Sequence, residues 1–139
     1  TTVSLGEVAS ANLGTLDLNG RNQQIAGLNS VTGSNTTTGN NHVTSVAAAT
    51  LTLGGSGTYS YGDGTNANSG TITGAISIVK TGTGTQTLGD TNTYTGTTTI
   101  SGGTLQFAKQ ASLYNNGTVA SWSASNITVN SGGTLALNV

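Results

Sequence analysis

Residues 76–107 read ISIVKTGTGTQTLGDTNTYTGTTTISGGTLQF. Apolar side chains stand two apart in this segment, as in Ile76-Ser77-Ile78 and Leu105-Gln106-Phe107, and Gly or Asn separates the runs. Side chains two apart project from the same side of a strand, and Gly and Asn favour turns. The segment therefore predicts several short strands joined by tight turns.

The same short alternation recurs outward from this segment in both directions. Gly103-Thr104-Leu105 returns as Gly133-Thr134-Leu135, 30 residues later, and the same three residues stand at 14–16. A looser copy begins at Ala49. No stretch predicts a convincing amphipathic helix. Repetition with an irregular period is typical of a solenoid whose coils differ in loop length.

We therefore expect an all-β chain that folds as one right-handed parallel β-helix over residues 1–139. Coils of roughly 20–30 residues would give about five or six coils. Each coil pairs with the next, and the inward side chains form one narrow core. The residues expected to face inward are Leu16, Leu18, Leu51, Leu53, Ile76, Ile78, Leu88, Ile100, Leu105, Phe107, Val129, Leu135 and Leu137.

Composition favours many strands and turns over a conventional globule. The chain has 28 Thr, 15 Ser, 15 Asn and 22 Gly among 139 residues, with 5% charged residues and no Pro or Cys. Thr suits a pleated surface, and a disordered chain would normally carry more charge. Three basic residues argue against nucleic-acid binding, no apolar run approaches a membrane span, and the lack of Cys excludes disulfides and thiolate zinc sites.

One known family shares the order of motifs in residues 76–107. The motifs are Lys80–Gly84, an apolar step at Thr87-Leu88, an Asn-x-Tyr-x-Gly-x-Thr pattern at Asn92–Thr98, and Gly103–Leu105. In this order they resemble the autotransporter-associated β-strand repeat, also called the passenger-associated transport repeat. The resemblance implies a right-handed β-helix, secretion, and a role as a stalk or passenger scaffold in a bacterial protein.

The chain offers little for catalysis. Its carboxylates are Glu7, Asp17, Asp63 and Asp90, widely spaced, whereas glycoside hydrolysis needs two carboxylates about 5–10 Å apart. His42 has no acid near it in sequence, so we expect a turn residue. We predict no catalytic residues, no cofactor and no enzymatic activity; a polysaccharide-active enzyme is the least favoured alternative.

Metal binding is also not expected. Leu53–Thr58 resembles a calcium-binding nonapeptide, but Thr58 stands where an Asp ligand belongs. The segment Asp63–Asn68 supplies one carboxylate and several amide oxygens, whereas calcium usually takes several carboxylate oxygens. We therefore predict no metal site.

A binding surface is the main alternative to a purely structural role. Tyr59, Tyr61 and Trp122 could contact a glycan, although aromatic residues also shield apolar surface. Alternating Thr residues at 81–87 and 91–99 would face one way, leaving Leu88 and Tyr94 to the other side. Such arrays can bind ice or crystalline polysaccharide, but these tracts are confined to one repeat, so a solvent-facing β-surface is the favoured explanation.

Two residue sets are expected at the corners between strands. Lys80 would lay its stem along the core and keep its ammonium in water. Asn12, Asn19, Asn92 and Asn130 could stack as amide ladders.

We predict a structural, non-catalytic rod or stalk segment outside a bacterial cell or on its surface. The alternative is an adhesin or glycan-binding module that contacts a glycan or a cell surface. Open strand edges invite another chain to add on, so we also expect end-to-end self-association into a fibre, or stacking on neighbouring repeats of a longer chain. Because the sequence starts at Thr1-Thr2-Val3, without Met or a recognisable signal peptide, we expect an internal piece or a processed product.

Overall fold

The computed structural model describes residues 1–6, 13–30, 41–62, 70–109, 112–113 and 126–138. In this part of the chain the backbone forms short strands joined by corners. The strands are β1 (Thr2–Leu5), β2 (Thr15–Asp17), β3 (Gln23–Ile25), β4 (Gly27–Ser30), β5 (His42–Thr44), β6 (Ala49–Leu53), β7 (Thr58–Tyr61), β8 (Thr71–Gly74), β9 (Ile76–Lys80), β10 (Thr85–Leu88), β11 (Thr93–Tyr94), β12 (Thr98–Ile100), β13 (Gly103–Phe107), β14 (Ile127–Val129) and β15 (Gly133–Leu137).

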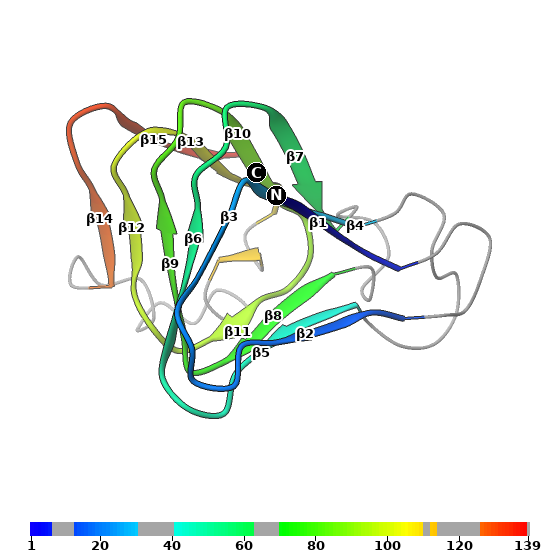
Figure 1. Cartoon of the computed structure of the whole chain (residues 1–139). Coiled ribbons are helices and arrows are strands. Elements are labelled where there is room, and N and C mark those ends of the chain that lie inside the picture. The colour runs from blue at the N-terminus through cyan, green and yellow to red at the C-terminus, as the bar shows by residue number, and fades with distance from the viewer. Residues whose placement is uncertain (7–12, 31–40, 63–69, 110–111, 114–125, 139) are drawn as a thin grey trace.

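The strands make three faces around a common interior (Figure 1). The first face holds β1 and β4, then β7, β10, β13 and β15; the second holds β2, β5, β8 and β11; the third holds β3, β6, β9, β12 and β14. The chain visits the faces in this order and returns one layer further along, so the strand pairs are parallel. This confirms the expected all-β parallel solenoid.

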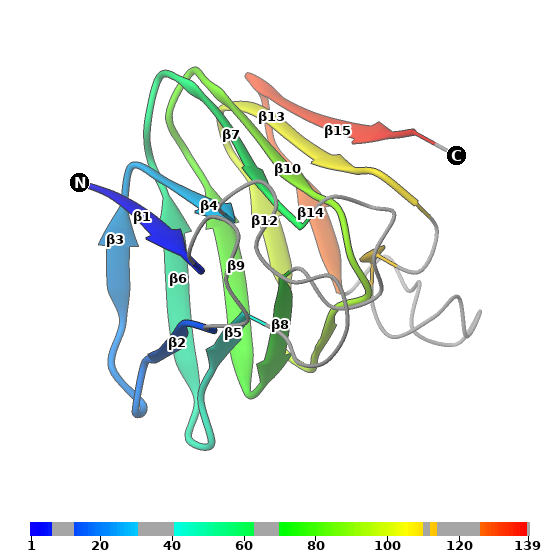
Figure 2. The same cartoon turned by 90° about the vertical axis from the view of Figure 1, so that its right-hand side faces the viewer.

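The layers stack from one end of the molecule to the other, with the two termini at opposite ends (Figure 2). Four turns carry a strand on each face, and β13, β14 and β15 continue the stack. The number of five or six coils is therefore not confirmed, since the described residues give about four turns. The right-handed winding stays a prediction.

Turn length varies along the stack, as the irregular sequence period indicated. Ala49 pairs with Ile76, 27 residues later, but Ile78 pairs with Thr98, only 20 residues later. Gly103 pairs with Gly133, which confirms the 30-residue displacement of the two Gly-Thr-Leu copies. Insertions and deletions fall in the corners because strand register must be kept for the inward rows to stack.

The interior of the described turns is a narrow column that contains one cluster of buried apolar side chains. Alternation along β6 and β9 buries every second side chain, and the pairing aligns those side chains from turn to turn. Of the residues expected to face inward, those buried in the structure are Leu18, Leu51, Leu53, Ile76, Ile78, Leu88, Ile100, Leu105 and Phe107. Leu16 and Leu135 are partly buried and pack against this cluster.

Two residues expected in the core are exposed instead. Val129 is 46% and Leu137 is 44% exposed, although Lys80 and Ile100, which precede Val129 in the same row, are buried. The reason is their position in the stack. Strands β14 and β15 are the last described strands of their faces, so no described turn covers their inward side chains.

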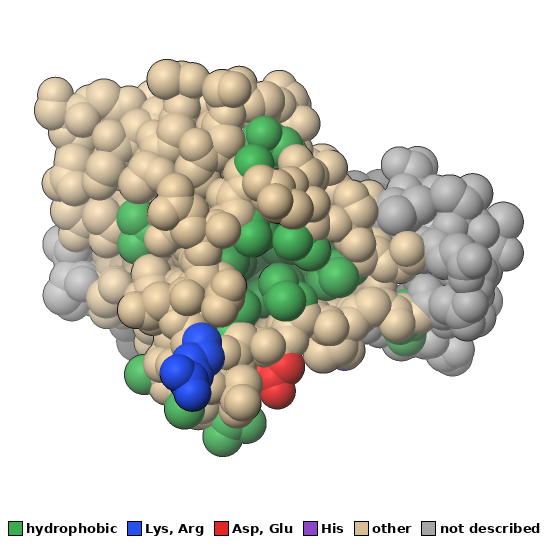
Figure 3. Space-filling model, viewed as in Figure 1, with side chains coloured by type: hydrophobic (Ala, Val, Ile, Leu, Met, Phe, Trp, Pro, Cys, Tyr) green, Lys and Arg blue, Asp and Glu red, His purple; other side chains and the backbone are tan. Residues whose placement is uncertain are grey.

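The opposite end of the column is also open to solvent. Figure 3 shows hydrophobic side chains gathered in a hollow at the centre of this view. The hydrophobic residues of the first turn that are only partly buried are Val3, Leu5, Leu16 and Ile25. No helix among the described residues has the length and apolar character to cross a membrane.

Candidate functional site

The turn built from the end of β9 through β13 differs most from its neighbours. It is the shortest complete turn, and its inward row mixes polar with apolar side chains. Gln86, Asn92 and Thr98 are buried beside Leu88 and Tyr94. The Tyr94 hydroxyl lies 2.7 Å from Thr98 Oγ1, so the ring keeps its polar end satisfied inside the core.

Threonines cover the outside of this turn. The odd-numbered Thr residues of 81–87 and 91–99 are exposed or half-buried, and none of them is buried. Thr58, Thr85, Thr104 and Thr134 also stand in register across four consecutive strands of the first face. The alternation therefore separates an outer hydroxyl surface from an inner row, as the sequence pattern indicated.

The tight corner between β10 and β11 holds a buried polar cluster, which we call the corner cluster: Asp90, Asn92 and Ser112. Asn92 accepts a hydrogen bond from Ile72 N at 2.8 Å and donates to Asp90 O at 3.0 Å and Ser112 O at 2.7 Å. The Ser112 hydroxyl donates to Gly89 O at 2.8 Å. One amide side chain thus joins three successive turns.

Asp90 supplies the charge of the corner cluster. Its Oδ2 accepts from Gly70 N at 2.8 Å, and its Oδ1 lies 3.7 Å from Lys109 Nζ. Gly62 has a left-handed φ of 82°, and a Cβ there would come within 2.8 Å of Asp90 Oδ2. Burial, and secondarily the Asp90 charge, raises the pKa of Tyr61. The carboxylate therefore organises the backbone of the preceding turn.

Lys80 occupies an inward position at the corner between the third and first faces. It pairs with Leu53 below and Ile100 above and is only 1% exposed. Its Nζ donates to Gly82 O at 2.5 Å and Gly102 O at 3.4 Å. The prediction that its ammonium lies in water was wrong, because the corner carbonyls point inward and take the charge.

A pH dependence follows from this burial. Desolvation lowers the pKa of Lys80, so between its folded pKa and 10.5 the unfolded chain binds more protons. The buried ammonium group of Lys80 therefore lowers the free energy of unfolding at neutral pH. This loss becomes smaller as the pH rises toward 10.5. We expect the wild type to gain stability relative to Lys80→Met between pH 7 and pH 10 in urea titrations. A difference that stays constant across this range would contradict the assignment.

Comparison with known families identifies this turn. Residues 78–107 match the family model of the passenger-associated-transport-repeat. This turn is a passenger-associated transport repeat. The match covers about a fifth of the chain and lies within the segment 76–107 predicted from sequence. No curated protein and no solved structure gives a match to the chain.

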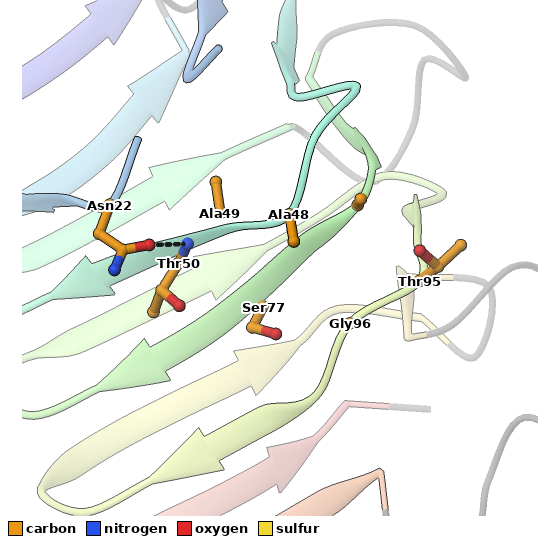
Figure 4. Close-up of a pocket in the computed structure, with 8 residues that line it drawn as sticks. Asn22, Ala48, Ala49, Thr50, Ser77, Thr95 and Gly96 are labelled. Atoms are coloured by element: carbon orange, nitrogen blue, oxygen red, sulfur yellow. Dashed lines mark hydrogen bonds between the residues drawn. The ribbon is translucent and has the colours of Figure 1, made fainter. Parts of the chain in front are cut away.

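The passenger-associated transport repeat also forms part of an open groove. The groove has a volume of about 370 Å³ and runs along the corner between the second and third faces (Figure 4). Its lining is neutral: Asn22, Ala48, Ala49, Thr50, Ala75, Ser77, Thr95 and Gly96. Asn22 Oδ1 accepts from Thr50 N at 2.8 Å, and Ser77 Oγ accepts from Thr97 N at 3.1 Å. The lining carries no acid, base or paired nucleophile.

The two described aromatic residues expected at a ligand surface, Tyr59 and Tyr61, do not form one. Tyr61 is completely buried and donates its hydroxyl to Asn41 O at 2.8 Å. The Tyr59 ring lies against Gly27, and its hydroxyl accepts from Gly57 N at 3.3 Å. Trp122 lies outside the described residues. Tyr61 was therefore wrongly assigned to the surface, because the inward row of β7 continues through it.

The described titratable residues that were considered for catalysis, His42 and Asp17, make hydrogen bonds to nearby protein groups. His42 is half-buried on the second face, with Nδ1 3.1 Å from Thr71 Oγ1. Asp17 is exposed, and its Oδ1 accepts from Asn19 N at 2.8 Å. Glu7 and Asp63 lie outside the described residues. Within the described ranges no group of three or more His, Asp or Glu side chains could hold a metal ion.

The predicted asparagine ladder does not form among the described residues. Asn19 lies in the corner after β2, Asn92 in the corner before β11, and Asn130 in the corner after β14. They therefore belong to three different corners and cannot stack. Asn12, the fourth member, lies outside the described residues.

Sequence reasoning missed Gln86 and assigned Asn92 the wrong role. Both follow the alternation of the inward row, two and four positions from Leu88, so the register was visible in the sequence. Their buried positions were not predicted because Gln and Asn are polar, and a polar side chain in a Thr-rich stretch is expected to face water.

Proposed function

We propose that this chain is a non-catalytic rod or stalk segment of a secreted or surface-displayed bacterial protein. The observation that carries the proposal is the place of the passenger-associated transport repeat in the stack. Its strands β10 and β12 pair in parallel with a turn on each side. The repeat is therefore a continuous part of the rod, and it extends the same core in both directions.

The use of the described carboxylates supports a structural role. Asp90 binds backbone N–H and a lysine, and Asp17 caps its own corner. General acid or nucleophilic catalysis needs such groups to face a substrate-sized site. The groove, which could accept a small molecule, is lined instead by neutral, mostly small side chains.

Binding and turnover assays on one preparation test this function. We expect no saturable binding to a bacterial and host glycan array and no release of reducing ends from polysaccharides. Saturable binding that is lost in Trp122→Ala and retained in Tyr61→Phe would instead establish the adhesin alternative. Turnover of any polysaccharide would overturn the non-catalytic assignment.

We also propose that the edge formed by β14 and β15 is covered by a further winding, from a neighbouring part of a longer chain or from a second copy. The half-exposed Val129 and Leu137 support this, because equivalent residues in interior turns are buried. No described strand pairs with the outer edges of these two strands, and the added strands would bond to the backbone groups there.

Sedimentation of the chain over a range of concentrations tests the second-copy case. We expect concentration-dependent association that Val129→Lys and Leu137→Lys each weaken by at least about tenfold, because a charge would be buried without a partner. The matched control is Val46→Lys, since Val46 is 96% exposed at a lateral corner. A monodisperse monomer at high concentration, or an equal effect of the control, would count against this contact.

A further inference from the structure

Strands β4 and β7 are neighbours on the first face, but no backbone hydrogen-bond ladder joins them. Every other pair of described strands that are adjacent on a face is joined by a parallel backbone ladder, but β4 and β7 belong to two separate sheets of the first face. The second and third faces run without a break past the same level, through β5–β8 and β6–β9. We call the β4–β7 boundary the seam.

Side chains replace the missing ladder across the seam. Asn29 Oδ1 accepts from Ser60 N at 2.8 Å, and Ser30 Oγ accepts from Gly62 N at 3.0 Å. Both acceptors belong to β4, and both donors lie in or just after β7. The corner before the seam is still bonded through its backbone, since Gly55 N donates to Ala26 O at 2.7 Å.

Gln86 provides the innermost connection. It pairs with Tyr59 in the ladder of β10 and β7, so its side chain must reach past β7 to meet β4. There its Oε1 accepts from Leu28 N at 2.8 Å and its Nε2 donates to Leu28 O at 2.8 Å. Both Gln86 and Leu28 are fully buried. A single amide therefore satisfies both backbone groups of Leu28 from two turns away.

Tyr59 packs against β4 at the seam. A Cβ on Gly27 would lie only 2.1–2.3 Å from three atoms of the Tyr59 ring, so the ring fills the space where a side chain would stand. The ring therefore stands against the backbone of β4 at the seam. The seam is thus built into the local sequence of both strands.

We propose that the solenoid opens locally along the seam, on the first face alone, with Gln86 as the latch. Each side-chain hydrogen bond across the seam gives a modest net stabilisation, and it costs side-chain conformational entropy. In a strand ladder, by contrast, each backbone hydrogen bond is supported by the adjacent bonds of the same ladder. The continuous second and third faces keep the two parts joined during opening. The seam therefore gives the rod a bending point between its second and third turns.

Native-state hydrogen exchange of the whole chain tests the proposal. The amide of Leu28 is the main reporter because it is buried and bonded only across the seam, and the amides of β9 are the reference. We expect Leu28 to exchange at least about tenfold faster than the β9 amides, through an opening with little dependence on denaturant. Exchange of Leu28 only together with β9 would overturn the proposal.

Two variants separate the latch from general destabilisation. Gln86→Leu should speed exchange of Leu28 and of the β1–β4 ladder by about tenfold or more and leave β9 little changed. Gln106→Leu is the control, because Gln106 is half-buried on the outer side of the same sheet one turn later. Equal acceleration of all amides in Gln86→Leu would show that Gln86 supports the whole fold and is no latch. If that variant does not fold, the wild-type comparison still decides.

Discussion

Asn92→Asp should lower the free energy of unfolding by about 3–5 kcal/mol at neutral pH, because it leaves two carbonyl groups without their donor and adds a buried charge. The substitution preserves shape and keeps the acceptor for Ile72 N. It removes the donor to Asp90 O and Ser112 O, and it adds a negative charge in the corner cluster that already holds the Asp90 carboxylate. Urea titration at pH 7 measures the loss.

The same substitution at an exposed site serves as the control. Asn22 uses its side-chain oxygen to accept from Thr50 N, and a carboxylate keeps that bond. Asn22→Asp should therefore change stability by no more than about 0.5 kcal/mol. Lowering the pH should restore part of the loss in Asn92→Asp, because the protonated acid can donate again. Similar losses in both variants would show that the buried donors do not matter.

Gly82→Ala should cost about 3 kcal/mol of unfolding free energy through steric overlap in the corner. A Cβ at this position would lie 2.1 Å from Gly54 O and 2.3 Å from Gly55 O, both backbone atoms of the turn below. Relief would require two stacked corners to move apart, and the paired strands on either side oppose this. Thermal and urea unfolding measure the effect.

A glycine in the same stack provides the matched control. A Cβ at Gly54 would meet Gln24 Nε2 at 3.2 Å and Thr81 Oγ1 at 3.3 Å, which are side-chain atoms that can move aside. Gly54→Ala should therefore cost less than about 1 kcal/mol. If Gly54→Ala proved the more harmful of the two, close backbone stacking would not be what requires glycine at these corners.

The strands and their inward rows could be predicted from local sequence, because alternation with period two needs only a few neighbouring residues. Ile76 and Ile78 show this, and so do Leu105 and Phe107, which are all buried. The repeat motif likewise identified the solenoid, since its order of Lys-Thr-Gly, Asn-x-Tyr and Gly-Thr-Leu spans one complete turn.

The candidate site was only partly predictable, because its key contacts join residues far apart in sequence. Gln86 meets Leu28 across 58 residues, and Asn92 meets Ile72 and Ser112 from one turn on each side. The sequence around Gln86 and Asn92 does not predict which residues they bond to. Lys80 shows the same limit, since its acceptor Gly102 lies 22 residues away in the next turn.

By itself, the sequence determined that this protein is a stack of short two-faced strands with a Thr-rich exterior, because backbone alternation converts residue order directly into sides of a strand. Tertiary structure alone decided where polar side chains enter the interior, where the first face breaks at the seam, and which apolar residues at the stack ends stay exposed. The physical reason is that burial and hydrogen-bond satisfaction at each position depend on the turns above and below it, whose distance along the chain changes from corner to corner.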